Sequence, residues 1–257
     1  MNLAIGDRVG SYRLIGQHAG GGFRALSMSG RARIEIVDAG DFRSRALELL
    51  RTSALVASLE HPGIARIVDR GVLPDHRPWI ATEIADGVPL SEIMNRRTLG
   101  VDEALELIRD VASILLHLHD RGLTHDALQP HAITIRTGAR SFPIQLGGWT
   151  TLRTGDGCGD IHALGVLAYR ALTGKFPGLH TPELIPGVSG AVSSLIVRML
   201  AADPEDRPEA AELFTEVAAL TGDRSLAGPR FARPRWTPSP DELQPIAEAI
   251  TLPLKRV

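Results

Sequence analysis

Cysteine and lysine are both rare in this sequence. Its 257 residues contain one cysteine, Cys158, which excludes an internal disulfide framework and a multi-cysteine metal site and is typical of a reducing compartment. Lysine occurs only at Lys175 and Lys255, so a positive charge needed before residue 175 must come from arginine or histidine.

The charge balance and the apolar runs exclude two further classes of protein. A formal net charge of −2 gives no positive field for gathering nucleic acid, and no apolar run is long enough to span a bilayer. The start of the chain, MNLAIGDRVG, lacks the basic and apolar regions of a signal peptide. We therefore expect a cytoplasmic protein with no membrane span and no nucleic-acid partner.

The first third of the chain has the pattern of an antiparallel sheet. Residues 12–37 alternate apolar and polar positions around the glycines at 20–22, which predicts strands joined by a tight turn. Apolar residues at helical spacing predict one main helix over 41–59. Two short strands are expected at 64–68 and 79–84.

After Gly87 the pattern changes to amphipathic helices, which favours an α+β fold with two lobes. Helices are expected at 101–121, 160–172, 191–200 and 208–220, the last with its proline in the first turn.

The domain organisation follows from this change of pattern. We predict an N-terminal extension over 1–10 and one domain over 11–220, divided into a sheet lobe at 11–85 and a helical lobe at 86–220. Prolines and arginines interrupt any periodicity in residues 221–257, which predicts a mobile tail.

Four stretches carry a resemblance to a known family. They are HPGIARIVDRG at 61–71, LHDRGLTHDALQPHAI at 118–133, DIHALGVLAYRALTGKFP at 160–177 and MLAADPEDRPEAAEL at 199–213. Together they resemble the bacterial Hanks-type serine/threonine protein kinases over residues 11–220. The resemblance implies a protein-kinase-like fold, with an N-terminal antiparallel sheet lobe and a mostly helical C-terminal lobe.

The resemblance also implies where phosphoryl transfer would take place, and this sequence departs from the family at those positions. The phosphate-binding lysine, its glutamate partner, the base, the loop lysine and two metal ligands correspond to Glu35, Thr52, Ala127, Gln129, Ala132 and Gly148. Alanine accepts no proton, and neither Ala132 nor Gly148 offers a side-chain oxygen to magnesium. We therefore predict a degenerate member, a pseudokinase that is not an enzyme and has no metal site.

The segment between Trp149 and Asp160 is much shorter than the activation segment that the family has there. This shortening predicts that the platform for a peptide substrate is missing. Asp160 matches an aspartate that braces the catalytic loop in the family. Arg207, whose usual glutamate partner belongs to the shortened segment, is expected to find another acid or to face solvent.

Two substitutes for the lost groups stay open. Asp126 lies one position before Ala127 and is a candidate for a shifted base. Arg24, Arg31 or Arg33 is a candidate for the lost lysine, although a guanidinium is a poor geometric substitute for an ammonium.

The stretch 82–87 resembles the hinge whose backbone groups hold adenine in the family. His18 replaces the second glycine of the phosphate-binding loop and is expected to crowd it. We predict no cofactor, and we leave ATP as a weak or metal-independent ligand of a site made by Glu83, Ala85, Gly16 and Gly21.

These observations favour a scaffold or allosteric regulator in bacterial signalling, with an active kinase or a phosphothreonine-binding module as its partner. Thr237 and Thr251 in the tail are candidate phosphorylation sites. One alternative is a residual phosphotransferase or nucleotidyltransferase that uses Asp126, Asp156 and an arginine of the sheet lobe. Another is a nucleotide-binding switch without turnover. The identity of the partner and the oligomeric state stay open.

Overall fold

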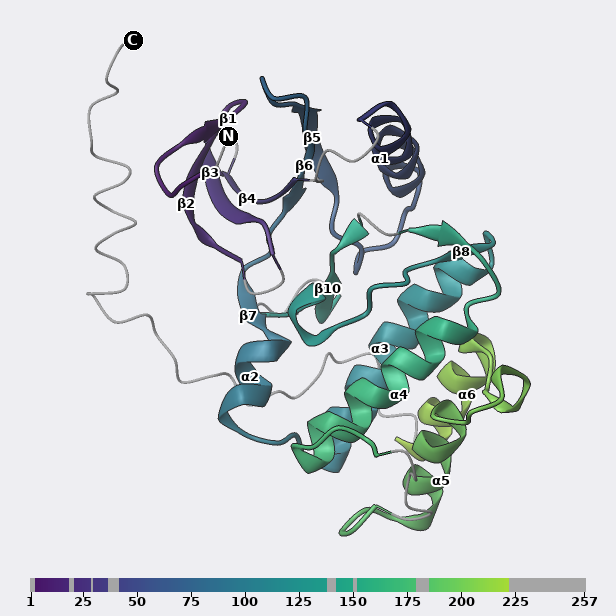
Figure 1. Ribbon diagram of the computed structural model, residues 1–257. Coiled ribbons are helices and arrows are strands. Elements are labelled where there is room, and N and C mark those ends of the chain that lie inside the picture. Colours follow the sequence, from purple (N-terminus) through teal and green to yellow (C-terminus); the bar gives the residue numbers. More distant parts are fainter. Residues whose placement is uncertain are drawn as a thin grey trace.

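The computed structural model describes residues 3–18, 21–28, 30–36, 42–137, 142–149, 152–178 and 185–221, with the backbone alone for 42–48 and 50 (Figure 1). Its first part is an antiparallel sheet with the strand order β1-β2-β3-β4-β6-β5. The strands are β1 (Arg8–Val9), β2 (Tyr12–Gln17), β3 (Phe23–Ser27), β4 (Gly30–Ile36), β5 (Ile67–Val72) and β6 (Pro78–Glu83). The helix α1 (Phe42–Ala57) packs beside β6 and β5.

The alternation along β4 decides which side chains reach the core of the sheet lobe. Ala32 and Ile34 are buried in an apolar cluster with Tyr12, Leu14 and other residues, whereas Arg33 and Glu35 point to the opposite face. Strands within 12–37 and the helix within 41–59 are therefore where the sequence predicts them.

The strand predicted at 64–68 is displaced in the structure. The strand β5 begins only at Ile67, because Ile64 instead forms an isolated bridge with Leu146, far along the chain. The amide of Ala65 donates to the carbonyl of Leu146 at 2.8 Å, and the amide of Leu146 donates to the carbonyl of Gly63 at 2.7 Å. This stretch consequently joins the two lobes rather than extending the sheet.

The second part is mostly helical and is built around α3. Its helices are α2 (Leu90–Arg96), α3 (Val101–His119), α4 (Cys158–Thr173), α5 (Gly190–Met199) and α6 (Ala210–Leu220). Leu107, Ile108, Val111 and Ile114 of α3 are fully buried, and α3 packs on both α4 and α6 (Figure 1). Among the residues that the structure describes, no helix has the length and apolar character needed to cross a membrane.

Short strands and turns complete this lobe beside α3. The strands β7 (Gly87–Pro89), β9 (Ile133–Arg136) and β10 (Ile144–Leu146) form one small sheet, and β8 (Leu123–Thr124) pairs with β11 (Arg153–Thr154). Two 3-10 turns are η1 (Pro130–Ala132) and η3 (Pro204–Asp206). The sequence patterns predicted neither β7 nor α2.

Two further details differ from the sequence-based expectation or lie beyond it. The helix predicted to contain Pro208 in its first turn begins instead at Ala210, because Glu209 and Glu212 cap its first turn. The candidate phosphorylation sites Thr237 and Thr251 lie outside the described residues, as does residue 222 and everything after it.

Candidate functional site

Several positions singled out by the sequence lie, with a few neighbours, where the sheet meets the helical lobe. We call this place the interlobe site: Gly16, His18, Arg24, Arg33, Glu35 and Thr82 from the sheet lobe, and His125, His131, Ala132 and Gly148 from the helical lobe. On the sheet, Gly16, Arg24, Arg33 and Thr82 stand directly opposite one another on β2, β3, β4 and β6. Residues in such a row share one face of a sheet.

Glu35, at the position of the family lysine, is held by an arginine of its own strand. Arg33 Nη2 lies 2.6 Å from Glu35 Oε1, and both residues are only 7% exposed. Burial raises the pKa of Glu35, and Arg33 opposes that shift, whereas burial lowers the pKa of Arg33, and Glu35 opposes it. Of the three arginines considered as substitutes, Arg33 is the buried one, and Arg31 pairs with Asp86 at the surface.

Two histidines meet edge to face across the interlobe site. His18 follows β2 and His131 belongs to η1, and their ring centroids are 6.5 Å apart. Burial lowers the pKa of His18 to about 4, with Arg33, His131 and Arg24 adding to the shift. Burial and Arg33 likewise lower the pKa of His131. His18 therefore lies beside His131 of the helical lobe.

The other predicted sheet-lobe residues are placed as follows. Thr52 is buried on α1 and carries no charge. Gly21 lies in the turn after His18 with a φ of 84°, a conformation that favours glycine. Residues 19 and 20 of the same loop are outside the described residues.

Asp160 braces the loop that carries Ala127, the role that the resemblance implied. Its carboxylate accepts from the amides of His125 at 2.8 Å and Asp126 at 2.9 Å, and lies 3.1 Å from His119 Nε2. Burial alone would raise the pKa of Asp160, but these bonds hold it below its ordinary value. The loop conformation thus depends on one buried carboxylate.

Asp126, the candidate for a shifted base, points to the surface. Its backbone is left-handed, with a φ of 58°, and its Oδ2 lies 3.5 Å from Arg153 Nε on β11. Both side chains are partly or largely exposed, at 37% and 68%. Ala127 donates its amide to His125 Nδ1 at 3.3 Å, and Gln129 is exposed on the same loop.

The two positions that correspond to metal ligands face each other without a side-chain oxygen. A Cβ added to Gly148 would lie 3.6 Å from Ala132 Cβ and 3.7 Å from His125 Cε1. Within the described part of the chain, no three histidine, cysteine, aspartate or glutamate residues lie close enough to hold a metal ion. Ala132 and Gly148 therefore contribute only apolar packing at this place.

Trp149 ties the helical lobe to the sheet lobe, and sequence reasoning missed this role. Its side chain is fully buried, its Nε1 donates to the carbonyl of Ala65 at 2.9 Å, and its ring meets His125 edge to face at 4.9 Å. The indole N–H, which a phenylalanine lacks, therefore reaches the connection between α1 and β5.

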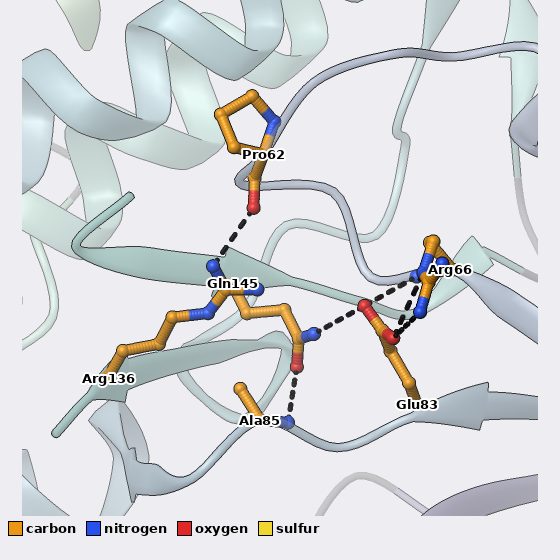
Figure 2. Close-up of polar contacts among 6 residues, drawn as sticks. All are labelled: Pro62, Arg66, Glu83, Ala85, Arg136 and Gln145. Carbon is orange, nitrogen blue, oxygen red and sulfur yellow. Dashed lines mark hydrogen bonds and ion pairs between the residues drawn. The ribbon is translucent and has the colours of Figure 1, made fainter. Parts of the chain in front are cut away.

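The predicted hinge already has a hydrogen-bond partner in this structure (Figure 2). The amide of Ala85 donates to Gln145 Oε1 at 2.8 Å, and Gln145 Nε2 donates to Glu83 Oε1 at 3.2 Å. Glu83 Oε2 also accepts from Arg66 Nε at 3.1 Å and Nη2 at 3.0 Å. A polar residue inside the apolar strand β10 is the sequence signal that could have revealed Gln145.

Two arginines are bound by backbone carbonyls. Arg136 Nη1 donates to the carbonyl of Pro62 at 3.0 Å, which links β9 to the α1–β5 connection (Figure 2). Arg207 donates to the carbonyls of Ala201, Cys158 and Ala202 at 2.8, 3.1 and 3.2 Å. The expectation that Arg207 finds another acid or faces solvent is therefore wrong, because three carbonyls take the place of the carboxylate.

Comparisons with known proteins add relatives and a similar structure. No protein-family model matches the chain. The serine/threonine-protein kinase pkn2 of Myxococcus xanthus is 26% identical over 74% of this chain and 29% of its own length. The serine/threonine-protein kinase PknJ of Mycobacterium tuberculosis is 27% identical over 70% of this chain and 38% of its own length. The chain thus spans well under half of these relatives.

A solved structure of the Rad53 kinase domain and SCD2 is similar to this chain, with a TM-score of 0.62 and 19% sequence identity. The match covers 79% of this chain and 84% of the chain in that structure. The chain has the protein-kinase fold. Its homologues are bacterial Hanks-type serine/threonine kinases, which confirms the predicted resemblance and the two-lobe fold class.

One prediction from the sequence is overturned by these relatives. The substitutions at Glu35, Ala127 and Gly148 led us to predict that the chain is not an enzyme. Several curated relatives, including PrkC of Bacillus subtilis, which is 24% identical over 82% of this chain, are named serine/threonine-protein kinases. These names point to a kinase enzyme, and we correct the prediction accordingly.

Proposed function

We propose that this kinase-fold chain acts in bacterial signalling as a scaffold or allosteric regulator that binds a protein partner. The proposal rests on the exposed apolar side chains of the edge strand of the sheet lobe. The strand β5 stands at the end of the sheet order, and its apolar side chains Val68 and Val72 are 47% and 52% exposed. Exposed apolar residues on a strand edge favour pairing with another chain.

The details of β5 fit a surface for a partner strand. Exposed and half-buried residues alternate along it, so Val68, Arg70 and Val72 are the exposed ones. Arg70 Nη1 donates to Ser53 Oγ of α1 at 2.8 Å, which fixes a charged side chain between the two valines. The partner that we propose is an active kinase or a phosphothreonine-binding module. We also propose ATP as a weak, metal-independent ligand of the chain.

Replacing both Val68 and Val72 with aspartate should weaken partner binding by about tenfold or more, because buried apolar contacts would become buried charges. The partner is obtained by co-purification with the intact chain, and its affinity is then measured by titration with purified proteins. If the partner is a kinase, its rate of substrate phosphorylation is measured with and without the chain.

The matched control is Phe176→Ser, which removes an exposed apolar side chain of the helical lobe, 66% exposed. This variant should bind the partner as the unchanged protein does. Equal affinity of the double β5 variant and the control would refute the β5 surface. An unchanged phosphorylation rate at saturating chain would refute allosteric regulation of a kinase partner.

Phosphoryl transfer is the second candidate function, because the relatives are named as kinases. The residues that we propose for it are Asp126, whose backbone is left-handed, and Asp156 and Arg33. Strained backbone of this kind is common at functional sites.

Incubating the protein with labelled ATP and magnesium or manganese tests this second candidate. If Asp126 acts as the base, Asp126→Asn should lower labelling of the chain or of a protein acceptor by about 10²-fold or more. The control is Asp120→Asn, at the exposed end of α3. Labelling that is equally strong in both variants would eliminate Asp126 as the base, and no labelling in any variant would eliminate this candidate.

A further inference from the structure

A pocket of about 390 Å³ lies where α1 ends and β5 begins, and none of its lining residues belongs to the interlobe site. We call it the α1–β5 pocket. Its apolar wall includes Val56, Leu59 and Ile64, which are buried, and Ile67, which is half-buried. Ala57, the last residue of α1, lines the pocket and is exposed. A pocket of this size can hold a large apolar side chain.

The charges around this pocket do not balance. Glu83 is bound by Arg66, with its Oε2 3.0 Å from Arg66 Nη2. Burial and the neighbouring His117 lower the pKa of His61 to about 4, so the imidazole of His61 is neutral at pH 7. Glu60 is exposed, and no ion pair or hydrogen bond joins its side chain to another described residue. The pocket therefore combines an apolar wall with one unbalanced carboxylate, which suits an apolar side chain next to a cation.

Residues 224–240 have the complementary composition. This stretch contains no acidic residue, and its aromatic residues are Phe231 and Trp236. Pro229 and Pro234 favour an extended backbone that needs no partner strand. An aromatic ring flanked by guanidinium groups matches both the apolar wall and the carboxylate of the pocket. The cations of this stretch are Arg224, Arg230, Arg233 and Arg235.

The tail is long enough to reach this pocket. It starts after Thr221, which follows α6, and α6 packs on α3. The helix α3 also contacts the pocket, because His61 Nε2 lies 3.3 Å from Ser113 Oγ. The 19 residues of α3 span about 28 Å, whereas residues 222–236 can extend to about 50 Å. Trp236 can therefore reach the pocket from whichever end of α3 the tail starts.

We propose that the basic segment of the tail, residues 229–236, docks in the α1–β5 pocket, with Trp236 against the apolar wall and a neighbouring arginine beside Glu60. A segment tethered to its own binding site has a millimolar effective concentration, so a contact with a dissociation constant of about 0.1 mM is already mostly formed. The docked segment lies next to Val68 of the β5 surface, because Ile67 lines the pocket. Docking requires neither a partner nor nucleotide, so its failure and a failure of the proposed function are distinguishable.

Acrylamide quenching of tryptophan fluorescence in the full chain tests this docking. The chain has three tryptophans, of which Trp79 and Trp149 are 4% and 0% exposed, so a neutral quencher distinguishes Trp236 from them. The variant Trp236→Phe gives the signal of the two buried tryptophans, and its difference from the unchanged protein gives the signal of Trp236. We expect Trp236 to be quenched more slowly in the chain than in a synthetic peptide of residues 224–240.

Variants of the pocket should release the tail. Ala57→Arg adds a bulky cation to the pocket and should shift the docking equilibrium toward the free tail by about tenfold or more. Glu60→Gln removes the unbalanced carboxylate and should shift this equilibrium in the same direction by about two- to fivefold. Both positions are exposed, so the variants should fold. The control Glu205→Gln removes an exposed carboxylate of η3 and should leave Trp236 as protected as in the unchanged protein.

Disulfide cross-linking identifies which chain supplies the docked segment. The native cysteine is first removed by Cys158→Ser, and the pair Ala57→Cys and Arg235→Cys is then introduced into the full chain. On mild oxidation this pair should form a disulfide within one chain about ten times faster than the control pair Met28→Cys and Arg235→Cys. Met28 is fully exposed in the turn between β3 and β4 and does not line the pocket.

Four results would overturn the inference. The first is a Trp236 that is quenched as fast in the chain as in the peptide, and the second is equal quenching in Ala57→Arg and Glu205→Gln. The third is an equal rate of disulfide formation by the two cysteine pairs. The fourth is a disulfide that joins two chains, because the occupant of the pocket would then belong to a second copy.

Discussion

Trp149→Ala should lower the free energy of unfolding by about 3–5 kcal/mol, which is typical for removing a large, fully buried aromatic side chain. Trp149 is 0% exposed and contacts His125, so its removal leaves a cavity between the lobes. The loss of its hydrogen bond also leaves the carbonyl of Ala65 without this donor. Urea unfolding followed by circular dichroism measures the change.

Trp149→Phe separates the contribution of the buried ring from that of the hydrogen bond to Ala65. It keeps most of the apolar volume and loses the indole N–H, so its cost should be about 1 kcal/mol plus the effect of imperfect packing. If Trp149→Ala cost no more than Trp149→Phe, the ring would not be a packing element between the lobes, and this reading of the contact would be wrong.

Asp160→Ala should destabilise the protein on a similar scale. The substitution leaves the amides of His125 and Asp126 without their acceptor, and each unsatisfied buried amide costs about 1–3 kcal/mol. His119 loses its partner as well. Because bonds to the ionised carboxylate hold its pKa below the ordinary value, the contribution of Asp160 is complete above its unfolded pKa and is lost as the pH falls through the folded one.

The matched control is Asp120→Ala, which removes an exposed carboxylate at the end of α3 and should change stability by less than about 0.5 kcal/mol. Unfolding of both variants is measured at pH 7. Similar stabilities of the two variants would show that the loop of Ala127 does not depend on Asp160. Amide hydrogen exchange at Asp126 provides a second readout, because the loop should exchange faster without its brace.

Sequence patterns with a short repeat predicted strands and helices, because these elements depend on residues that are close together in the chain. The alternation over 12–37 predicted β2, β3 and β4, and the helical spacing after residue 101 predicted α3 with its buried face. The missing side chains at Ala127, Ala132 and Gly148 could also be read directly, since an alanine or a glycine has no polar side-chain group in any fold. The strand at 64–68 was misplaced because its start pairs with a distant segment.

The sequence by itself determined that the chain has a sheet lobe followed by a helical lobe and that arginine and histidine are its only cations before residue 175. Only the tertiary structure decided which of these cations meet: Arg33 is buried beside Glu35, and His18 touches His131 from the other lobe. It also decided that Gln145 takes the amide of Ala85, 60 residues away, and that Trp149 reaches Ala65, 84 residues away. Periodicity reports the local environment of a residue, whereas these partners depend on how the two lobes pack.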